Sequence, residues 1–298
     1  MAEVHHFTYG VFNPIAAYLL AFLGSFLGLL CTGRARAARS KGRRSRWLII
    51  AAFAIGGAAI WLMHFTAMLG FDVPSSPVRY DVGLTMVSLA LAVAFVGIGL
   101  LIVGHGRRSL PKTATSGAIT GSGVLAMHYS GMRAMHLPGE IHYRPTLVAA
   151  SAVIAVVAAT VALWFAQSVK GWAPITAAAA VMAVAVCGMH YTGMAAMQVE
   201  LAPLEEWQRV GGGVRPLVMI LPITLLTAAT IVGMALSALQ AMTEEEFTDG
   251  AGTPRRGAHA GPSSSPWSLK QASTLSVASR RPSPRPVSLR ASADASNS

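Results

Sequence analysis

The sequence predicts an all-α integral membrane protein with seven transmembrane helices, arranged as three repeated helix pairs plus a seventh helix, and a disordered C-terminal tail. Two observations support this prediction. Of the 298 residues, 53% are hydrophobic and only 12% are charged, whereas soluble domains are about 25% charged. Seven apolar segments are also long enough to cross a hydrocarbon core of about 30 Å, which needs ~20 residues of helix. Within lipid, a helix satisfies the backbone polar groups of such segments.

The seven predicted spans follow one another with short connections. They comprise residues 11–32, 47–70, 82–104, 114–136, 146–168, 174–197 and 216–241. The first span is not expected to be a cleaved signal peptide, because it lacks a basic leader and arginine-rich sequence follows it. Gly24 and Gly28 in the first span, and Gly117 and Gly121 in the fourth, are expected to let neighbouring helices approach closely.

The loops between these spans differ in charge, and this sets the expected orientation. Residues 33–46 contain seven basic residues and no acidic one, and residues 105–113 and the connection near Lys170 are also basic only. The alternate loops contain six acidic residues beside five arginines. By the positive-inside rule the basic loops are cytoplasmic. We therefore expect a multi-pass protein in the lipid bilayer of the plasma (inner) membrane, with the N-terminus outside and the C-terminus in the cytoplasm.

One short motif occurs three times, near the end of every second span. Its histidines are 64 and 62 residues apart, and spans two, four and six run outward, so the histidines are expected at similar depth near the outer face. A lone histidine in a span is most simply a hydrogen-bonding residue. Three matched copies of a group that is costly in lipid indicate a function. The copies are Met63–Met68 (MHFTAM), Met127–Met132 (MHYSGM) and Met189–Met194 (MHYTGM).

Helical phase places methionines on the same side as each histidine. Positions four and seven residues further along a helix return to nearly the same face. We therefore expect three stripes of imidazole and thioether that could converge, with one fewer sulfur in the first. Such a donor set suits copper, especially Cu(I), and suits magnesium and calcium poorly. The expected partners are Met132 and Met135 for His128, Met194 and Met197 for His190, and Met68 and Phe71 for His64.

The threefold Met-His-Tyr-Thr pattern at the outer ends of alternate spans resembles the MHYT domain, a bacterial integral-membrane sensor module. The resemblance covers residues about 7–242. It implies copper bound through histidine and methionine, and sensing of a diatomic gas such as O2, CO or NO. This chain departs from the pattern at Phe65, in place of Tyr, and at Ser130, in place of Thr. The implied ligands are His64, Met68, His128, Met132, His190 and Met194, with Met63, Met127 and Met189 as the leading positions of the motif.

Two domains are expected, a seven-span membrane domain over residues 1–242 and a cytoplasmic tail over residues 243–298. The tail is rich in Ser, Pro and Arg and poor in large apolar residues, so it cannot bury a core and should be disordered. Members of the resembled family often carry a cyclic-di-GMP enzyme or a histidine kinase, which some 56 residues cannot form. A signal would then have to pass to a separate cytoplasmic output protein.

The sequence indicates neither an enzyme nor a nucleic-acid-binding protein. No paired carboxylates lie within the predicted spans and no nucleophile–base arrangement is recognisable, so no catalytic or organic-cofactor residues are predicted. The net charge of +11 is spread between apolar runs and the tail, without an aromatic-interleaved face. A membrane sensor is favoured over a copper transporter, which should have donors continuing toward the cytoplasmic side. It is also favoured over a haem protein, because no attachment motif exists.

Overall fold

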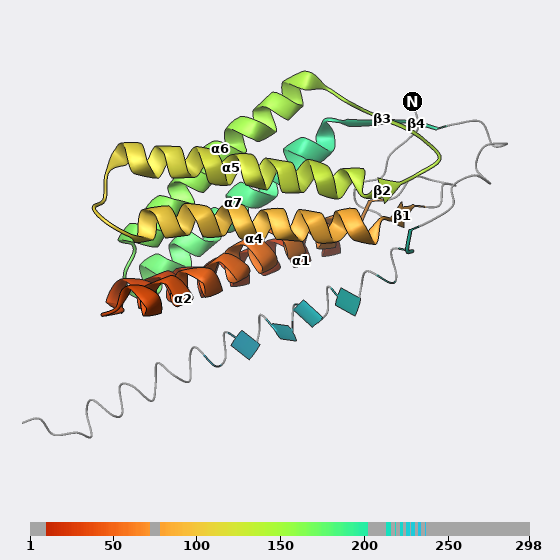
Figure 1. The fold of residues 1–298 in the computed structure, drawn as a ribbon. Helices are drawn as coiled ribbons and strands as arrows, with labels where there is room; N and C mark the ends of the chain where they lie inside the picture. Colours follow the sequence, from red (N-terminus) through yellow and green to blue (C-terminus); the bar gives the residue numbers. More distant parts are fainter. Residues whose placement is uncertain are drawn as a thin grey trace, which may run out of the picture. The chain divides into compact units, whose positions relative to one another are not determined.

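The computed structural model describes residues 10–71, 78–201 and 213–215, together with residues 218, 221–222, 225–226, 228–229, 232–233 and 236. Long helices dominate the first two ranges (Figure 1). The second helix is continuous but passes from an α-helical to a π-helical and back to an α-helical geometry, so it carries three labels. The helices are α1 (Phe12–Ala37), α2 (Lys41–Ala52), η1 (Phe53–Leu62), α3 (Met63–Met68), α4 (Val82–Gly104), α5 (Leu110–Arg133), α6 (Pro145–Ser168) and α7 (Trp172–Ala195).

The prediction of an all-α membrane protein is confirmed at this level. Among the described residues, five helices are long and apolar enough to cross a membrane, namely α1, the continuous helix Lys41–Met68, α4, α6 and α7. The predicted fourth span is also a helix, α5, but falls short of that apolarity. The described residues between 218 and 236 are helical, whereas most of the predicted seventh span at 216–241 and the whole predicted tail at 243–298 lie outside the described residues. The number of seven spans therefore stays a prediction.

Helix α5 is less apolar because several of its polar side chains face its neighbours in the bundle. The hydroxyl of Thr120 donates to the carbonyl of Phe95 on α4 at 3.3 Å. The hydroxyl of Thr113 accepts from the amide of Gln167 on α6 at 3.1 Å. Buried polar groups need such partners, and these two hydrogen bonds show that α5 packs against α4 on one side and α6 on another.

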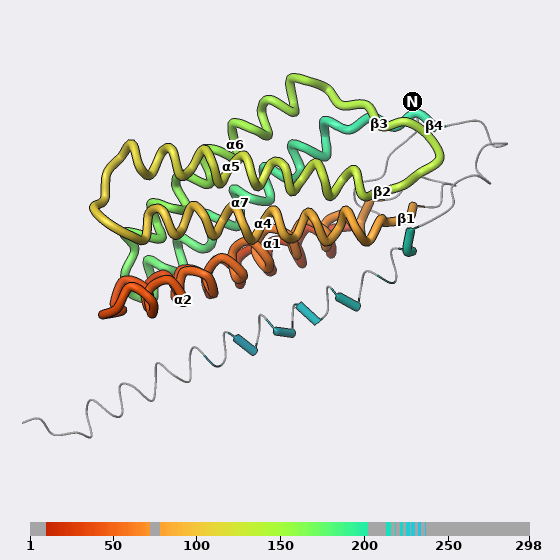
Figure 2. Tube along the Cα trace, viewed as in Figure 1, coloured from red at the N-terminus to blue at the C-terminus, as the bar shows by residue number. Residues whose placement is uncertain are grey.

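The long helices form a closed ring in which each packs against its neighbours in the chain. Helix η1 packs on α1 and α4, α5 lies between α4 and α6, and α7 packs on α6 and returns to α1 (Figure 2). The predicted close approaches are confirmed. A Cβ on Gly24 would lie 2.4 Å from the backbone nitrogen of Ala59 in η1, and a Cβ on Gly121 would lie 2.6 Å from the Cα of Val156 in α6. Small residues thus set the spacing of two helix pairs.

Helix η1 is a ten-residue π-helical stretch that the sequence reasoning did not foresee. It lies directly before α3, the short helix that carries His64. The ring nitrogen of the fully buried Trp61 donates to the hydroxyl of Ser88 on α4 at 3.0 Å, which ties η1 to its neighbour. A π-helix places more residues in each turn than an α-helix, and π-turns are frequent at functional sites. The stretch therefore sets the direction in which His64 points.

Two short antiparallel ladders connect the ends of the histidine-bearing helices. Strand β1 (Arg79–Tyr80) pairs with β2 (Met135–His136), and β3 (Gly139–Tyr143) pairs with β4 (Met197–Leu201). We expected Met135 and Met197 to lie on the same helical face as their histidines, seven residues further along. This expectation is wrong, because both residues lie in these strands. Phe71 likewise lies beyond the end of α3. All three side chains are nevertheless buried.

Candidate metal centre

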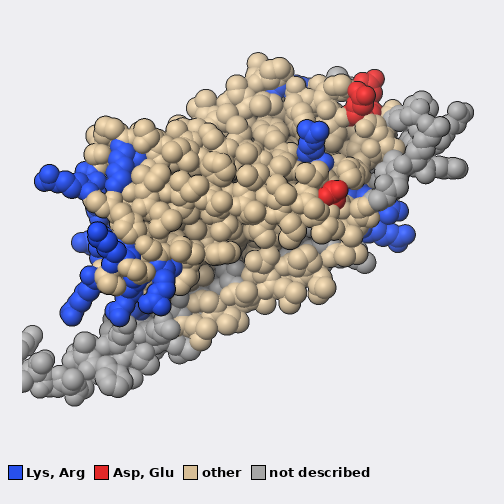
Figure 3. Space-filling model, viewed as in Figure 1, with Lys and Arg blue, Asp and Glu red and all other residues tan. Residues whose placement is uncertain are grey.

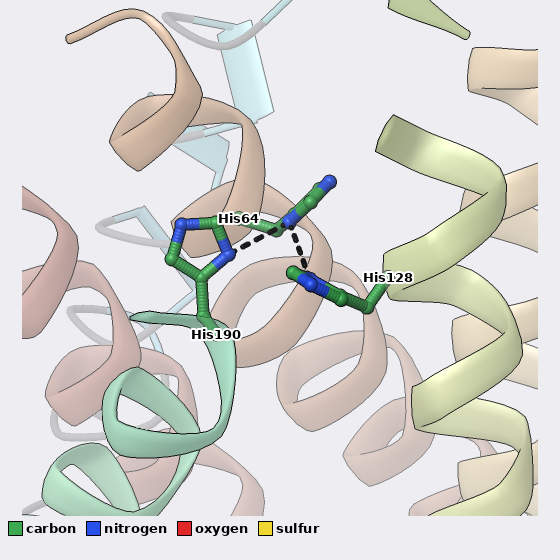
Figure 4. Close-up of side chains that lie close together, drawn as sticks. All are labelled: His64, His128 and His190. Atoms are coloured by element: carbon green, nitrogen blue, oxygen red, sulfur yellow. Dashed lines mark hydrogen bonds between the residues drawn. The ribbon is translucent and has the colours of Figure 1, made fainter. Parts of the chain in front are cut away.

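The three motif histidines come together inside the bundle. His64 lies on α3, His128 on α5 and His190 on α7, and the imidazoles point toward one another in Figure 4. The Nδ1 atom of His64 lies 2.9 Å from Nδ1 of His190 and 3.3 Å from Nδ1 of His128. One possible ligand atom from each ring lies within 4.8 Å of the others. Three helices that are separate in sequence thus build one cluster.

The imidazoles are arranged almost symmetrically and are shut away from solvent. Ring centroids are 4.9 to 5.2 Å apart, and the ring planes make angles of 73° to 89° with one another. The exposed fractions of His64, His128 and His190 are 0%, 0% and 1%. In the described part of the chain, these residues form the one group of histidine, cysteine or acidic side chains close enough to hold a metal ion.

The spacing of the inner nitrogens fits a metal ion. Three nitrogen ligands at 2.0–2.1 Å from one ion stand about 3.3–3.5 Å from one another, close to the observed 2.9 and 3.3 Å. Nδ1 of His64 faces both other rings, and a neutral imidazole nitrogen carries either one proton or one lone pair. A single proton cannot satisfy two facing nitrogens. A cation among the three rings would accept all three lone pairs, so the donor set fits a metal.

The outer nitrogens of two rings rest on glycines of the next motif copy. A Cβ on Gly131 would lie 2.5 Å from Nε2 of His64, and a Cβ on Gly193 would lie 2.2 Å from Nε2 of His128. Both Nε2 atoms are buried without a hydrogen-bond partner among the described residues. The glycine at the fifth motif position therefore makes room for the histidine of the preceding copy. Sequence reasoning missed this role, although Gly recurs there in the second and third copies and Ala67 takes its place in the first.

The aromatic residue after each histidine packs edge-on against its ring. Ring centroids are 4.9 Å apart for His64 and Phe65 and 4.9 Å apart for His128 and Tyr129, each pair nearly perpendicular. The contact is thus the same with or without a phenolic hydroxyl, so Phe65 keeps the packing role of the motif position. Tyr129 also contacts Tyr143 on β3. Burial, with a further contribution from Tyr129, raises the pKa of Tyr143 to about 12, so its phenol stays neutral at physiological pH.

The motif methionines are all buried, with exposed fractions of 0% to 4%. Met63 packs in a small cluster with Ala17 and Ala21 of α1 and Ala183 of α7. Met189 borders an apolar cavity of about 60 Å³. The motif thus buries six thioethers near the histidines in sequence, and ligation by sulfur stays a prediction. The six residues are Met63, Met68, Met127, Met132, Met189 and Met194.

Two further histidines near the same end of the bundle do not join the cluster. His136 lies in β2 and is exposed. His142 lies in β3, where its Nε2 is 3.6 Å from a carboxylate oxygen of Glu140 and 4.0 Å from one of Glu200. These distances place His142 in an exposed strand pair with acidic neighbours. His136 and His142 can therefore serve as control positions in mutagenesis, because both lie outside the buried cluster.

The fold and the cluster define the class: a helical membrane protein in which three helices share a buried group of possible metal ligands. Comparison with known proteins narrows this class. Residues 57–116 and 121–179 match the MHYT family, described as a bacterial signalling protein N-terminal repeat. This chain therefore carries MHYT repeats over that part of its length. The third motif copy, Met189–Met194, lies beyond the matched residues yet supplies the third histidine of the cluster.

Several bacterial signalling proteins are similar to this chain. The bifunctional diguanylate cyclase/cyclic di-GMP phosphodiesterase MucR of Pseudomonas aeruginosa is 38% identical over 233 residues, which are 76% of this chain and 34% of MucR. The cyclic di-GMP phosphodiesterase NbdA of the same organism is 34% identical over 207 residues, 66% of this chain and 26% of NbdA. Signaling protein YkoW of Bacillus subtilis is 28% identical over 207 residues, 66% of this chain and 25% of YkoW. The chain thus spans about a third or less of these relatives, and no solved structure matches it.

Proposed function

We propose that this chain is a membrane-embedded sensor that receives its signal at a copper ion held by His64, His128 and His190. The observation that carries the proposal is the convergence of three buried imidazoles, with Nδ1 separations of 2.9 and 3.3 Å, from three separate helices. Ionisable side chains within membrane segments are costly and are usually functional. The relation to bacterial signalling proteins supports a sensory role.

Copper is proposed over other metals because of the residues around the cluster. Imidazole alone suits zinc, copper, iron and nickel, whereas thioether sulfur selects Cu(I). The motif supplies six buried methionines close in sequence to the histidines. When bound, copper would supply affinity for a diatomic gas such as O2, CO or NO, together with a change of oxidation state. The protein's part is to hold the three imidazoles neutral, oriented and away from water.

The signal would travel by helix packing. Each histidine sits on a different helix, so a change in the preferred distances among the three rings acts on α3, α5 and α7 together. A ligand shifts such an equilibrium only by its different affinity for the two arrangements. Because MucR and NbdA are named as cyclic di-GMP enzymes, we propose that the output lies in the cytoplasm, on a separate protein or on further chain, and that this membrane part is not itself an enzyme.

A copper transporter, the alternative raised by the sequence, is less well supported. Transport needs successive sites along a path, and the described residues contain one group of possible ligands, closed to solvent. Copper uptake into vesicles that is lost in a His128→Ala variant would reverse this preference.

Metal analysis of the detergent-purified protein tests the proposal. We expect about one copper ion per chain after loading with Cu(I), and loss of that copper in the His64→Ala, His128→Ala and His190→Ala variants, because three imidazoles hold the ion together. His142→Ala is the matched control, since this strand histidine is exposed and lies outside the cluster. Retention of copper by a variant with all three histidines replaced by alanine, or failure of the wild-type protein to bind copper, would refute the site.

A further inference from the structure

A second cavity lies at the arginine-rich end of the bundle, away from the histidine cluster. It has a volume of about 160 Å³ and is bordered by α1, α2, the end of α4, α6 and the connection from α4 to α5. A water molecule needs roughly 10–15 Å³ of such space, so the cavity has room for a polyatomic ligand. Its polar lining comes from Thr32, Arg36, Arg44, Arg108 and Gln167.

The charge around this cavity is of one sign. Figure 3 shows Lys and Arg side chains gathered at this end of the bundle, with the acidic side chains in view at the other. Within the described residues the carboxylates belong to Asp81, Glu140 and Glu200. Asp81 caps the start of α4, and the two glutamates lie in the paired strands β3 and β4. All three are therefore at the end of the bundle that holds the histidine cluster. The described part of the chain thus offers no carboxylate to the cavity arginines.

Of the cavity arginines, Arg36 is held in place and Arg44 keeps a donor to spare. The guanidinium of Arg36 donates to the carbonyls of Ala166 and Val169 at the end of α6. Arg44 makes one long contact, from Nη1 to the carbonyl of Gly104 at 3.5 Å. Its Nε is buried and has no hydrogen-bond partner among the described residues. A buried donor without an acceptor is costly, so this nitrogen is available to an acceptor that enters the cavity.

The two other polar groups of the lining are already engaged. The hydroxyl of Thr32 donates to the carbonyl of Leu29 at 2.8 Å. The side-chain nitrogen of Gln167 donates to the hydroxyl of Thr113 and to the carbonyl of Leu163, both at 3.1 Å. The donors left for a ligand are therefore guanidinium N–H groups, brought together from three segments of the chain. Guanidinium groups match the oxygens of a phosphate in paired hydrogen bonds and stay charged at every physiological pH.

We propose that this cavity binds a phosphate group through Arg44 and Arg108, with Arg36 fixed at its wall. The same chemistry could reach the cavity as a soluble phosphate or as the phosphate of an anionic lipid headgroup, since basic residues near a membrane surface attract anionic lipid. The site does not depend on the metal proposed above. It lies at the opposite end of the helices and uses none of the motif residues.

Binding of inorganic phosphate to delipidated protein in detergent is the first test. We expect saturable binding by titration calorimetry, weakened roughly ten-fold or more in Arg44→Gln and in Arg108→Gln, because each removes a charge-assisted hydrogen bond. Arg46→Gln is the matched control, because Arg46 is exposed on the same helix as Arg44, does not line the cavity and carries the same charge. Arg36 is left unchanged because it also anchors α6.

Reconstitution separates the two sources of the phosphate. Bound phosphatidylglycerol, measured by mass spectrometry of the lipid that stays with protein extracted from mixed nanodiscs with phosphatidylcholine, should be lower in Arg44→Gln than in Arg46→Gln if a headgroup fills the cavity. Binding of inorganic phosphate without such lipid selection identifies a soluble phosphate, and either result supports the site. Equal effects of Arg44→Gln and Arg46→Gln, or no binding of phosphate and no lipid selection, would overturn it. Circular dichroism of each variant checks that the fold is intact.

Discussion

At the scale of single residues, the close packing of a histidine ring explains why two copies of the motif carry glycine at the fifth position. The ring of His64 packs against Gly131 and that of His128 against Gly193, so the histidine of one copy lies against the backbone of the next copy. A methyl group at either position would meet a nitrogen within 2.5 Å, closer than atoms can pack. The glycine of the motif thus acts between copies, whereas the aromatic residue packs on the histidine of its own copy.

The glycine role predicts a specific loss. Gly131→Ala and Gly193→Ala should each displace an imidazole, lowering the free energy of unfolding by about 1–3 kcal/mol through overpacking and weakening copper retention. Gly188→Ala is the control on the same helix as Gly193, because its Cβ would meet open space, and it should be neutral or stabilising by up to about 1 kcal/mol. Thermal unfolding in detergent and copper content measure the two effects. Equal behaviour of Gly193→Ala and Gly188→Ala would remove the proposed role.

At the scale of elements, helix ends and helix contacts decide which residues reach the centre. Helices α5 and α7 end soon after their motif histidines, at Arg133 and Ala195, and the chain turns into strands. Met135 and Met197 therefore leave the helical stripe that periodicity predicts. The π-helical stretch η1 alters the helical phase just before His64, which regular periodicity cannot anticipate.

The contact between α5 and α6 predicts an element-level effect. Gly121→Ala should push the helices apart, because its Cβ would lie 2.6 to 2.9 Å from backbone atoms of Val156 and Ala155 that cannot rotate away. Gly28→Ala is the contrast, since the atoms that its Cβ would crowd, at 2.3 and 2.7 Å, belong to the side chain of Ile55. We expect a loss of about 1–3 kcal/mol for Gly121→Ala and a smaller one for Gly28→Ala. Thermal unfolding monitored by circular dichroism compares them, and the reverse order would contradict the packing argument.

At the scale of the whole bundle, charge divides the two ends. Basic residues cluster at the end formed by the connections α1–α2 and α4–α5, while the acidic side chains in view lie at the other end beside a few basic ones (Figure 3). By the positive-inside rule we propose that the arginine-rich end faces the cytoplasm. The metal centre would then lie toward the outside, and the phosphate cavity toward the cytoplasm.

Labelling of single cysteines checks this orientation. In a background with Cys31 and Cys187 replaced, Ser109→Cys at the exposed start of α5 should be protected in intact cells from a membrane-impermeant maleimide. Glu140→Cys in the exposed strand β3 should react, because it lies at the opposite end. Both should react after the cells are opened. Labelling of Ser109→Cys but not Glu140→Cys in intact cells would mean the inverse topology.

Much of the architecture could be predicted because it depends on local properties of the chain. Six of the predicted spans coincide within a few residues with long helices, since apolar length and loop charge are read directly along the sequence. The three histidines could be singled out because the motif repeats at nearly constant spacing. The short strands were missed because they carry few residues, and the strand pairing of β3 with β4 joins segments that are distant in the chain.

The all-α membrane class, the positions of six helices and the choice of the three histidines follow from hydrophobicity, charge and repetition, which can be read along the chain. The closure of the helices into a ring, the approach of Nδ1 of His64 to the other two rings at 2.9 and 3.3 Å, and the cavity lined by arginines from three segments appear only in three dimensions. Those features depend on helix phase and crossing, which are set by packing between segments far apart in the chain.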